Sequence, residues 1–138
     1  MFKKLRKNEK GFTLAELLIV VAIIGVLVAI SIPIFTGQLE KAREATDAAN
    51  IRAAYAAVST DVLLDSQDSD TANDVTYNKD AKTYTATVKP TQKQAEWQTE
   101  SIKTDGIGGQ KVAALIEGEW TITGDVASGK VTITPAAK

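Results

Sequence analysis

The pattern of apolar and polar positions divides the chain into three parts. Residues 12–35 are apolar apart from Thr13, Ser31 and one acid, Glu16. Residues 39–64 are rich in alanine and charge and contain neither proline nor glycine. Beyond residue 75 the apolar period falls to two, as in Tyr84-Thr85-Ala86-Thr87-Val88. We therefore expect one long helix followed by antiparallel strands with one apolar face, an α+β fold.

The helical pattern over residues 39–64 has two apolar stripes. The larger side chains are Ile51, Tyr55, Val58 and Val62, and they predict the face that packs on the apolar side of the sheet. The small stripe consists of Leu39, Ala42, Ala45, Ala49, Ala53 and Ala56. It either packs within the chain or lets a second helix approach closely. The spacing of Glu40, Arg43 and Asp47 predicts ion pairs on the solvated side of the helix.

Alternating segments and turn residues predict the sheet. Strands are expected around Tyr84–Val88, Trp120–Ile122 and Val131–Ile133, with connections at 78–80 and 124–129. Val112–Ile116 is a further candidate strand, and residues 90–109 are expected to be irregular. Gly106–Lys111 lacks the spacing of a phosphate-binding loop and is interpreted as a turn. Trp97 and Trp120 are expected in the core or over a sheet edge.

The 24 residues from Phe12 to Phe35 are long enough to cross a membrane, since a helix of this length spans about 36 Å. Five basic residues precede Gly11 against one acid, which predicts a cytoplasmic N-terminus and a single pass. Glu16 lies about 6 Å along the helix from Phe12, near the headgroup boundary. Gly25 and Pro33 weaken the helix, so a kink or a segment able to extend is expected between them.

The composition lacks residue types on which many enzymes depend. The 138 residues include no cysteine and no histidine, which excludes disulfides and the commonest metal ligands and acid/base groups. No paired carboxylates or nucleophile–base pair can be assigned, so we expect neither catalytic residues nor a cofactor. Without residues 1–11 the chain carries 11 basic and 16 acidic side chains, a net charge of −5. Bulk binding to nucleic acid is therefore not expected.

Residues 65–74 form an acidic, polar stretch that should end the helix. Asp68, Asp70 and Asp74 could collect a hard cation, but the stretch lacks the glycine turn and terminal glutamate of an EF-hand loop. A solvated connection is the favoured interpretation, with calcium as the weaker one, and no metal site is assigned.

One alternative for the N-terminus is an ordinary secretory signal with a cut after Ala29-Ile30-Ser31, which would release a binding domain starting at Ile32. An uncleaved signal anchor is another. However, Lys10-Gly11-Phe12-Thr13-Leu14-Ala15-Glu16 and the apolar run behind it resemble the class III signal of type IV pilin precursors. Gly25 and Pro33 also fall where pilins have helix-weakening positions.

This resemblance implies a division into a basic leader at 1–11, a membrane or filament-core helix at 12–35, and a globular head at 36–138. It implies that a prepilin peptidase cuts between Gly11 and Phe12 and methylates the Phe12 amine. Glu16, with Thr13 beside it, would set the register of assembly by pairing with Phe12 of a neighbouring subunit. Gly25 and Pro33 would provide helix flexibility.

By the same resemblance, the chain would be a structural subunit that forms a homopolymer through its N-terminal helices. It would start as a single-pass protein of the cytoplasmic membrane and end in a cell-surface filament, with a platform protein and an assembly ATPase as indirect partners. A pseudopilin of a secretion or DNA-uptake system is the alternative, because pseudopilins share this N-terminal sequence motif. The absence of cysteine departs from many Gram-negative pilins, whose C-terminal region is closed by a disulfide.

Overall fold

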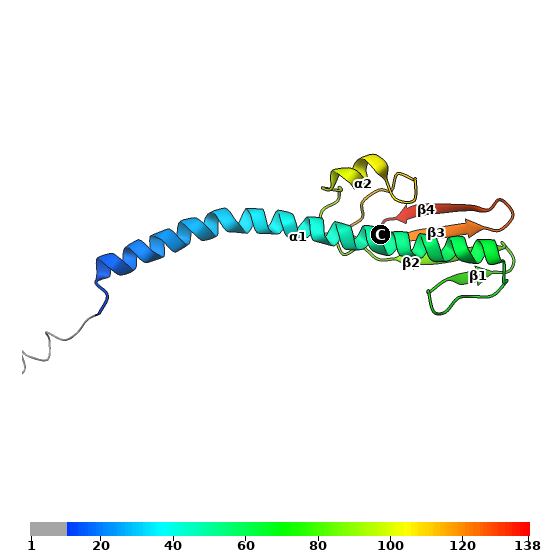
Figure 1. The fold of residues 1–138 in the computed structure, drawn as a ribbon, viewed down its shortest axis with the longest axis horizontal. Coiled ribbons are helices and arrows are strands. Elements are labelled where there is room, and N and C mark those ends of the chain that lie inside the picture. The colour runs from blue at the N-terminus through cyan, green and yellow to red at the C-terminus, as the bar shows by residue number, and fades with distance from the viewer. Residues whose placement is uncertain (1–10) are drawn as a thin grey trace, which may run out of the picture. The chain divides into compact units, whose positions relative to one another are not determined.

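A computed structural model describes residues 11–138 and has the predicted α+β architecture (Figure 1). The helix α1 covers Leu14–Leu64, and a short helix α2 covers Glu100–Asp105. The strands are β1 (Thr76–Asn78), β2 (Thr83–Val88), β3 (Glu119–Asp125) and β4 (Lys130–Ala136). The chain divides into two compact units, one ending at Gly37 and one of residues 38–138, which are described separately.

The four strands form one antiparallel sheet in the order β1-β2-β3-β4. Its register pairs Ala86 with Ile122, and Ile122 with Ile133, so the apolar side chains lie on one face. The other face carries threonines in matched positions, as in the row Thr85, Thr123 and Thr132. The predicted connections are confirmed in position but not in their bounds. Residues 79–82 join β1 to β2 and residues 126–129 join β3 to β4, while Asn78, Gly124 and Asp125 belong to strands.

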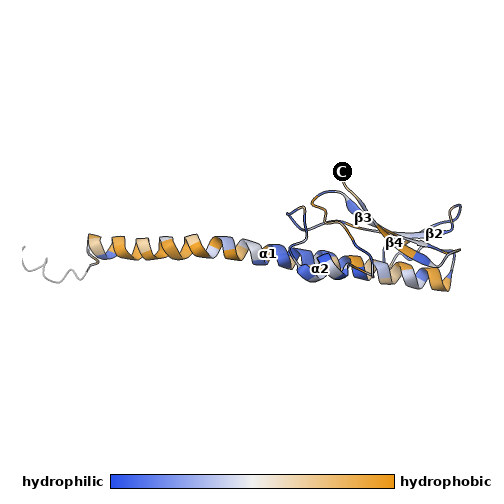
Figure 2. Ribbon diagram, turned by 90° about the horizontal axis from the view of Figure 1, so that it is seen from above, coloured by the Kyte–Doolittle hydropathy of each residue, from blue (hydrophilic) through white to orange (hydrophobic). Residues whose placement is uncertain are grey.

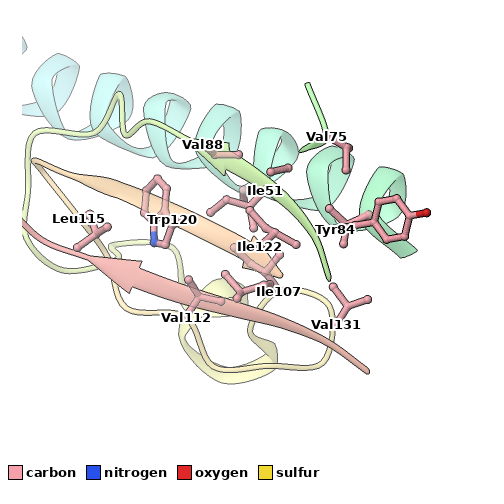
Figure 3. Packing of buried hydrophobic residues seen from close by; sticks show 14 of the residues in the cluster. Ile51, Val75, Tyr84, Val88, Ile107, Val112, Leu115, Trp120, Ile122 and Val131 are labelled. Atoms are coloured by element: carbon pink, nitrogen blue, oxygen red, sulfur yellow. The ribbon is translucent and has the colours of Figure 1, made fainter. Parts of the chain in front are cut away.

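The core of residues 38–138 lies between α1 and the apolar face of the sheet (Figure 3). Ile51 and Val58 of α1 are fully buried, Val62 is nearly so, and Tyr55 is partly buried against them. Trp120 and Ile122 of β3 are fully buried opposite the helix. The prediction that the larger stripe of the helix packs on the sheet is therefore confirmed.

The small stripe of α1 is not part of this core. Its five alanines are exposed, and Leu39 is 39% exposed. Packing within the chain therefore does not account for this stripe, which leaves its interhelical interpretation open.

The prediction for the charged positions of α1 is confirmed for the Glu40–Arg43 ion pair, but it is wrong about the solvated side of the helix and about the pair with Asp47. Glu40 and Asp47 are 3% and 0% exposed rather than solvated, and Glu44 is also fully buried. Arg43 pairs with Glu40 at 3.3 Å, and the structure shows no pair between Arg43 and Asp47. These three carboxylates lie at i, i+4 and i+7, on one face of the helix.

The three carboxylates bind the backbone of residues 91–99. Glu40 Oε1 accepts the amide hydrogens of Lys93 and Gln94, at 2.6 and 2.8 Å. Asp47 accepts those of Thr91 and Gln92 at 2.9–3.0 Å. Glu44 accepts those of Gln98 and Thr99 at 2.5 and 2.8 Å, and also the Thr99 hydroxyl at 2.7 Å. We call Glu40, Glu44 and Asp47 the carboxylate row.

The region predicted as irregular contains α2, whose Ile102 is buried in the core. Thr99 is the N-cap residue of α2, but its hydroxyl donates to Glu44 instead of capping the helix. The turn after α2 is confirmed by two backbone hydrogen bonds between Ile107 and Gln110. Gly106 has φ 69°, and a Cβ there would overlap the Gln110 carbonyl, so glycine is required.

The candidate strand at Val112–Ile116 is wrong, since the segment lies outside the sheet. Three of its carbonyl oxygens accept hydrogen bonds from side chains instead of from a neighbouring strand. The indole N–H groups of Trp97 and Trp120 donate to Val112 and Ala113 at 2.7 and 2.9 Å, and the Gln92 amide donates to Leu115 at 2.9 Å. Both tryptophans are buried and stack with ring centroids 5.9 Å apart, which confirms their core position.

Candidate functional site

The candidate site is the N-terminal part of the described chain, Gly11 to Phe35, where apolar side chains are exposed. Every residue from Leu14 to Phe35 is exposed, including Phe35 at 68%. Figure 2 shows this stretch of α1 as almost continuously hydrophobic, in contrast to the mixed colouring further along the helix. By length and composition α1 can cross a membrane, and its most apolar stretch is not buried in the chain. Such a surface requires lipid or another apolar partner.

The start of α1 is fixed by a reciprocal pair of hydrogen bonds between Thr13 and Glu16. The Thr13 amide donates to Glu16 Oε2 at 2.7 Å, and the Glu16 amide donates to Thr13 Oγ1 at 3.2 Å. This is a capping box, in which residues at N-cap and N3 satisfy two backbone donors that have no partner inside the helix. Thr13 is thus the N-cap, and Leu14 is the first helical residue.

The capping box gives Glu16 a role that the sequence reasoning missed. The resemblance assigns Glu16 only a partner in a neighbouring subunit, whereas its Oε2 accepts the Thr13 amide hydrogen of the same chain. The signal was present, because Thr-Leu-Ala-Glu before an apolar run has the spacing of a capping box. The other oxygen, Oε1, makes no hydrogen bond to any residue from 11 to 138.

Gly11 and Phe12 precede this cap and are not helical. Both are exposed, with Phe12 at 85%. The bond between them therefore lies in exposed, non-helical chain directly before a capped helix. Residues 3–10, which carry the leader charges, lie outside the described part of the chain.

Gly25 and Pro33 both lie inside α1, which is assigned as helix throughout. A Cβ at Gly25 would meet no atom within 4 Å, so no contact within the chain requires glycine there. Pro33 has no amide hydrogen, which leaves the Ala29 carbonyl without its usual donor. The Ser31 hydroxyl does not compensate, because it donates to Leu27 at 2.7 Å. The predicted ability of this region to extend stays a prediction.

The described residues contain no group of three or more aspartates or glutamates arranged to hold a metal ion. The acidic stretch 65–74 is a loop after α1, with residues 65–69 exposed. The site therefore consists of an exposed apolar helix, its capping box and the peptide bond before it.

A comparison with known protein families matches most of this segment. The family model for the prokaryotic N-terminal methylation motif matches residues 6–32. The Thermus thermophilus protein "Type IV narrow pilus major component PilA5" is 50% identical over 52 residues, which is 36% of this chain and 45% of that protein. The Myxococcus xanthus "Type IV major pilin protein PilA" is 40% identical over 68 residues, 49% of this chain and 31% of that protein.

A fimbrial protein of Dichelobacter nodosus is 36% identical over 83 residues, covering 58% of this chain and 52% of that protein. The chain thus spans about half or less of the length of these relatives. No solved structure matches the chain.

The motif and the capped apolar helix define a protein with an N-terminal methylation signal. Through this segment and these relatives, the chain is similar to proteins of the type IV pilin superfamily. This is a family of structural proteins rather than enzymes.

Proposed function

We propose that this chain is the subunit of a type IV pilus, and that its activity is polymerisation. The observation that carries the proposal is the exposed apolar half of α1 directly behind the methylation motif. A free chain with this surface needs lipid, and an assembled one can bury the surface against other copies. The relatives named for pili and fimbriae support a pilus subunit. A pseudopilin is the alternative, and the first test below separates the two.

In this proposal a prepilin peptidase cuts between Gly11 and Phe12 on the cytoplasmic side and methylates the new amine. The exposed, non-helical Gly11-Phe12 bond supports this step. Cleavage places a positive amine one residue before the N-cap, beside a helix terminus that itself attracts negative charge. A carboxylate from another subunit is the complementary group.

Glu16 supplies that carboxylate. Its Oε2 stays bound to the Thr13 amide, while Oε1 accepts the Phe12 amine of a neighbouring subunit. The capping box therefore orients the carboxylate before assembly, and it need not break for the pair to form. In a dry filament core an unpaired carboxylate is strongly disfavoured, so only subunits in register would be stable.

Before assembly, residues 12–35 hold the chain in the cytoplasmic membrane with its N-terminus inside. A platform protein and an assembly ATPase then move it into the filament. Gly25 and Pro33 lower the cost of local extension during this transfer, since glycine and proline both weaken helix. The exposed apolar surface and the missing amide donor at Pro33 support this role.

The first test is the N-terminus of mature protein isolated from the envelope or from sheared surface material. Edman sequencing or mass spectrometry should give Phe12 with one methyl group. A start at Ile32 would instead indicate ordinary signal cleavage. Electron microscopy of the same material should show long fibres, whereas short envelope-bound assemblies would contradict the pilus and favour a pseudopilin.

The second test separates the charge of Glu16 from its capping role. Glu16→Gln keeps an oxygen for the Thr13 amide but cannot neutralise an amine, whereas Glu16→Ala removes both functions. We expect both variants to be processed and inserted, and both to lose most or all fibres on immunoblots of sheared material. Glu96→Ala, an exposed change in the head, is the control and should assemble normally. If Glu16→Gln formed fibres as well as wild type, capping alone would be the role of Glu16.

A further inference from the structure

A shallow hollow beside the last turns of α1 contains two neighbouring carboxylates. Its volume is about 300 Å³, and its lining is Ala53, Ala56, Ala57, Thr60, Asp61, Asp70 and Asn73. The alanines belong to α1. The oxygen-bearing side chains are those of Thr60 and Asp61, near the end of α1, and of Asp70 and Asn73, in the loop that follows. All of these residues belong to the unit 38–138.

Asp61 is the unusual member of this group. Its side chain is 92% buried, and Oδ2 has no hydrogen-bond partner among residues 11–138. Each carboxylate of the carboxylate row, by contrast, accepts at least two backbone amides. A buried carboxylate without donors is unfavourable unless a cation or a proton neutralises it.

Asp70 is the member of the pair whose ionised form is stabilised by hydrogen bonds. Its Oδ1 accepts the amides of Ala72 and Asn73 at 3.0 and 3.3 Å, and its Oδ2 accepts the Asn73 side-chain amide at 2.6 Å. These bonds, the one from the Asn73 side chain above all, hold the pKa of Asp70 below its usual range. For Asp61, burial and then the charge of Asp70 raise the pKa. The two carboxylates are thus electrostatic neighbours.

The surroundings offer little positive charge to neutralise them. Residues 61–80 contain six aspartates and one basic side chain, Lys79. The ion pairs among the described residues are Arg43–Glu40 and Lys103–Glu100, and neither involves this hollow. A negative, partly desolvated site of this kind attracts small cations.

We propose that Asp61 and Asp70 bind a hard divalent cation, with calcium as the best fit. Calcium prefers oxygen ligands in a flexible arrangement and accepts water in the remaining positions. Thr60 and Asn73 offer neutral oxygens in the same hollow, since the Thr60 hydroxyl donates its hydrogen to Ala56 and the Asn73 amide nitrogen donates to Asp70. With only two carboxylates, the expected dissociation constant is about 0.1–1 mM, as in extracellular calcium modules.

This site differs from the cation interpretation of the sequence, which grouped Asp70 with Asp68 and Asp74. Asp68 is exposed, and its Oδ1 accepts the amide of the next residue, Ser69. The helix contributes Asp61, which no loop pattern includes. A cation bound here would join α1 to the loop that leads to Val75, a residue 2% exposed in the core. The cation would therefore stabilise the attachment of this loop to the helix.

The test is a calcium titration of the full chain in detergent micelles, followed by thermal unfolding of the near-ultraviolet circular dichroism signal. We expect Tm to rise by a few degrees and to saturate at millimolar CaCl2, because a ligand that binds only the folded state stabilises it. KCl at matched ionic strength should not reproduce the rise, which excludes simple screening. Equilibrium dialysis should give one calcium ion per chain.

Asp61→Asn and Asp70→Asn should abolish the response, whereas the matched loop variant Asp68→Asn should keep it. An equal rise with MgCl2 would support a site for hydrated divalent cations in general. The proposal is overturned if wild type does not respond, if KCl gives the same rise, or if Asp61→Asn responds like wild type. A wild type insensitive to cations would show that a proton neutralises Asp61. If the Asp61 variant did not fold, dialysis of Asp70→Asn against Asp68→Asn would decide.

Discussion

At the scale of single residues, the carboxylate row explains how a segment without regular structure is held in place. Residues 91–99 lie outside the sheet, so their amide groups lack strand partners. Six of those amides donate to Glu40, Glu44 or Asp47. Hydrogen bonds to a charged acceptor contribute about 1.5–3 kcal/mol, more than neutral ones. These hydrogen bonds therefore compensate for the burial of three carboxylates on one helix face.

Replacing Glu44 with Gln should destabilise residues 38–138 by about 2 kcal/mol, since one of its two oxygens becomes an amide that faces a backbone donor. Urea unfolding monitored by tryptophan fluorescence measures this loss. Glu100→Gln is the matched control, because Glu100 is exposed and only pairs with Lys103 at 3.8 Å. Its effect should stay within about 0.5 kcal/mol. Equal effects for the two variants would mean that the Glu44 bonds contribute little.

Glu40 should make stability sensitive to acid. Burial alone would raise the pKa of Glu40, but the amides of Gln94 and Lys93 together with Arg43 outweigh burial and lower it. A folded-state pKa below the unfolded one means that the unfolded state binds more protons, so stability falls as pH decreases through this range. The window begins near the ordinary glutamate pKa of about 4.3.

The measurement is the urea midpoint of wild type and Glu40→Gln between neutral pH and about pH 3, below the ordinary glutamate pKa. The midpoint should fall more steeply for wild type, because the variant has lost this titration. Parallel profiles would contradict the assignment. Asp61 acts in the opposite direction, because its raised pKa means that its protonation at low pH stabilises the folded state. The same measurement on Asp61→Asn separates that contribution from the one of Glu40.

At the scale of secondary-structure elements, helix and sheet approach each other closely at Gly124 of β3. A Cβ at this position would overlap the side chains of Val62 and Val58 on α1. Glycine is thus required by contact rather than by backbone conformation. It lets a residue of the central strand lie against the helix where the two valines are buried.

Gly124→Ala should destabilise residues 38–138 by about 1–3 kcal/mol, the usual cost of overpacking a core. Val62→Ala removes one of the overlapped side chains, so the double variant should be more stable than the sum of the two single losses predicts. Urea unfolding of the four proteins in the cycle measures the coupling. Additive losses would show that the strand shifts instead of pressing on Val62.

The segment 112–115 shows why an apolar run does not by itself specify a strand. Val112 and Leu115 are buried as their residue types predict, but the carbonyls of 112, 113 and 115 accept side-chain donors. Those donors come from Gln92, Trp97 and Trp120, up to 23 residues away. The edge strand β4 is capped in a similar way by Gln110, which donates to the Val131 carbonyl and accepts the Ile133 amide.

At the scale of the whole molecule, the packed core and the exposed apolar run are separate in the sequence. The core cluster contains residues from Ala48 to Ile133, and the exposed apolar run ends at Phe35. Glu40 is the first buried residue of α1. The unit 38–138 thus carries its own core, and the preceding helix contributes no buried side chain to it.

A chain starting at Gln38 should therefore fold as a soluble monomer, while one starting at Ala48 should be much less stable. The second chain keeps the apolar core but loses the whole carboxylate row, which leaves six backbone amides of 91–99 without those partners. Circular dichroism melts and gel filtration compare the two chains. If both chains melted alike, the row would not be needed for the fold.

The sequence by itself determined the long helix with its membrane-compatible half and the strands β2, β3 and β4, because these depend on local periodicity and length. It did not determine β1, α2 or the structure of residues 112–116. It also identified the N-terminal motif at Gly11–Glu16, since every residue of that motif is contiguous. The capping box at Thr13 and Glu16 was readable from the same local text.

Only the tertiary structure decided whether the charged side chains of α1 are buried and which conformation residues 91–115 adopt. The i, i+4, i+7 spacing of Glu40, Glu44 and Asp47 is equally compatible with a solvated face. Their burial depends on a segment about 45–55 residues further along the chain that brings its amides to them. Likewise, the neighbouring carboxylates of Asp61 and Asp70 belong to different elements. Long-range donors and charges, which no local pattern records, set these environments.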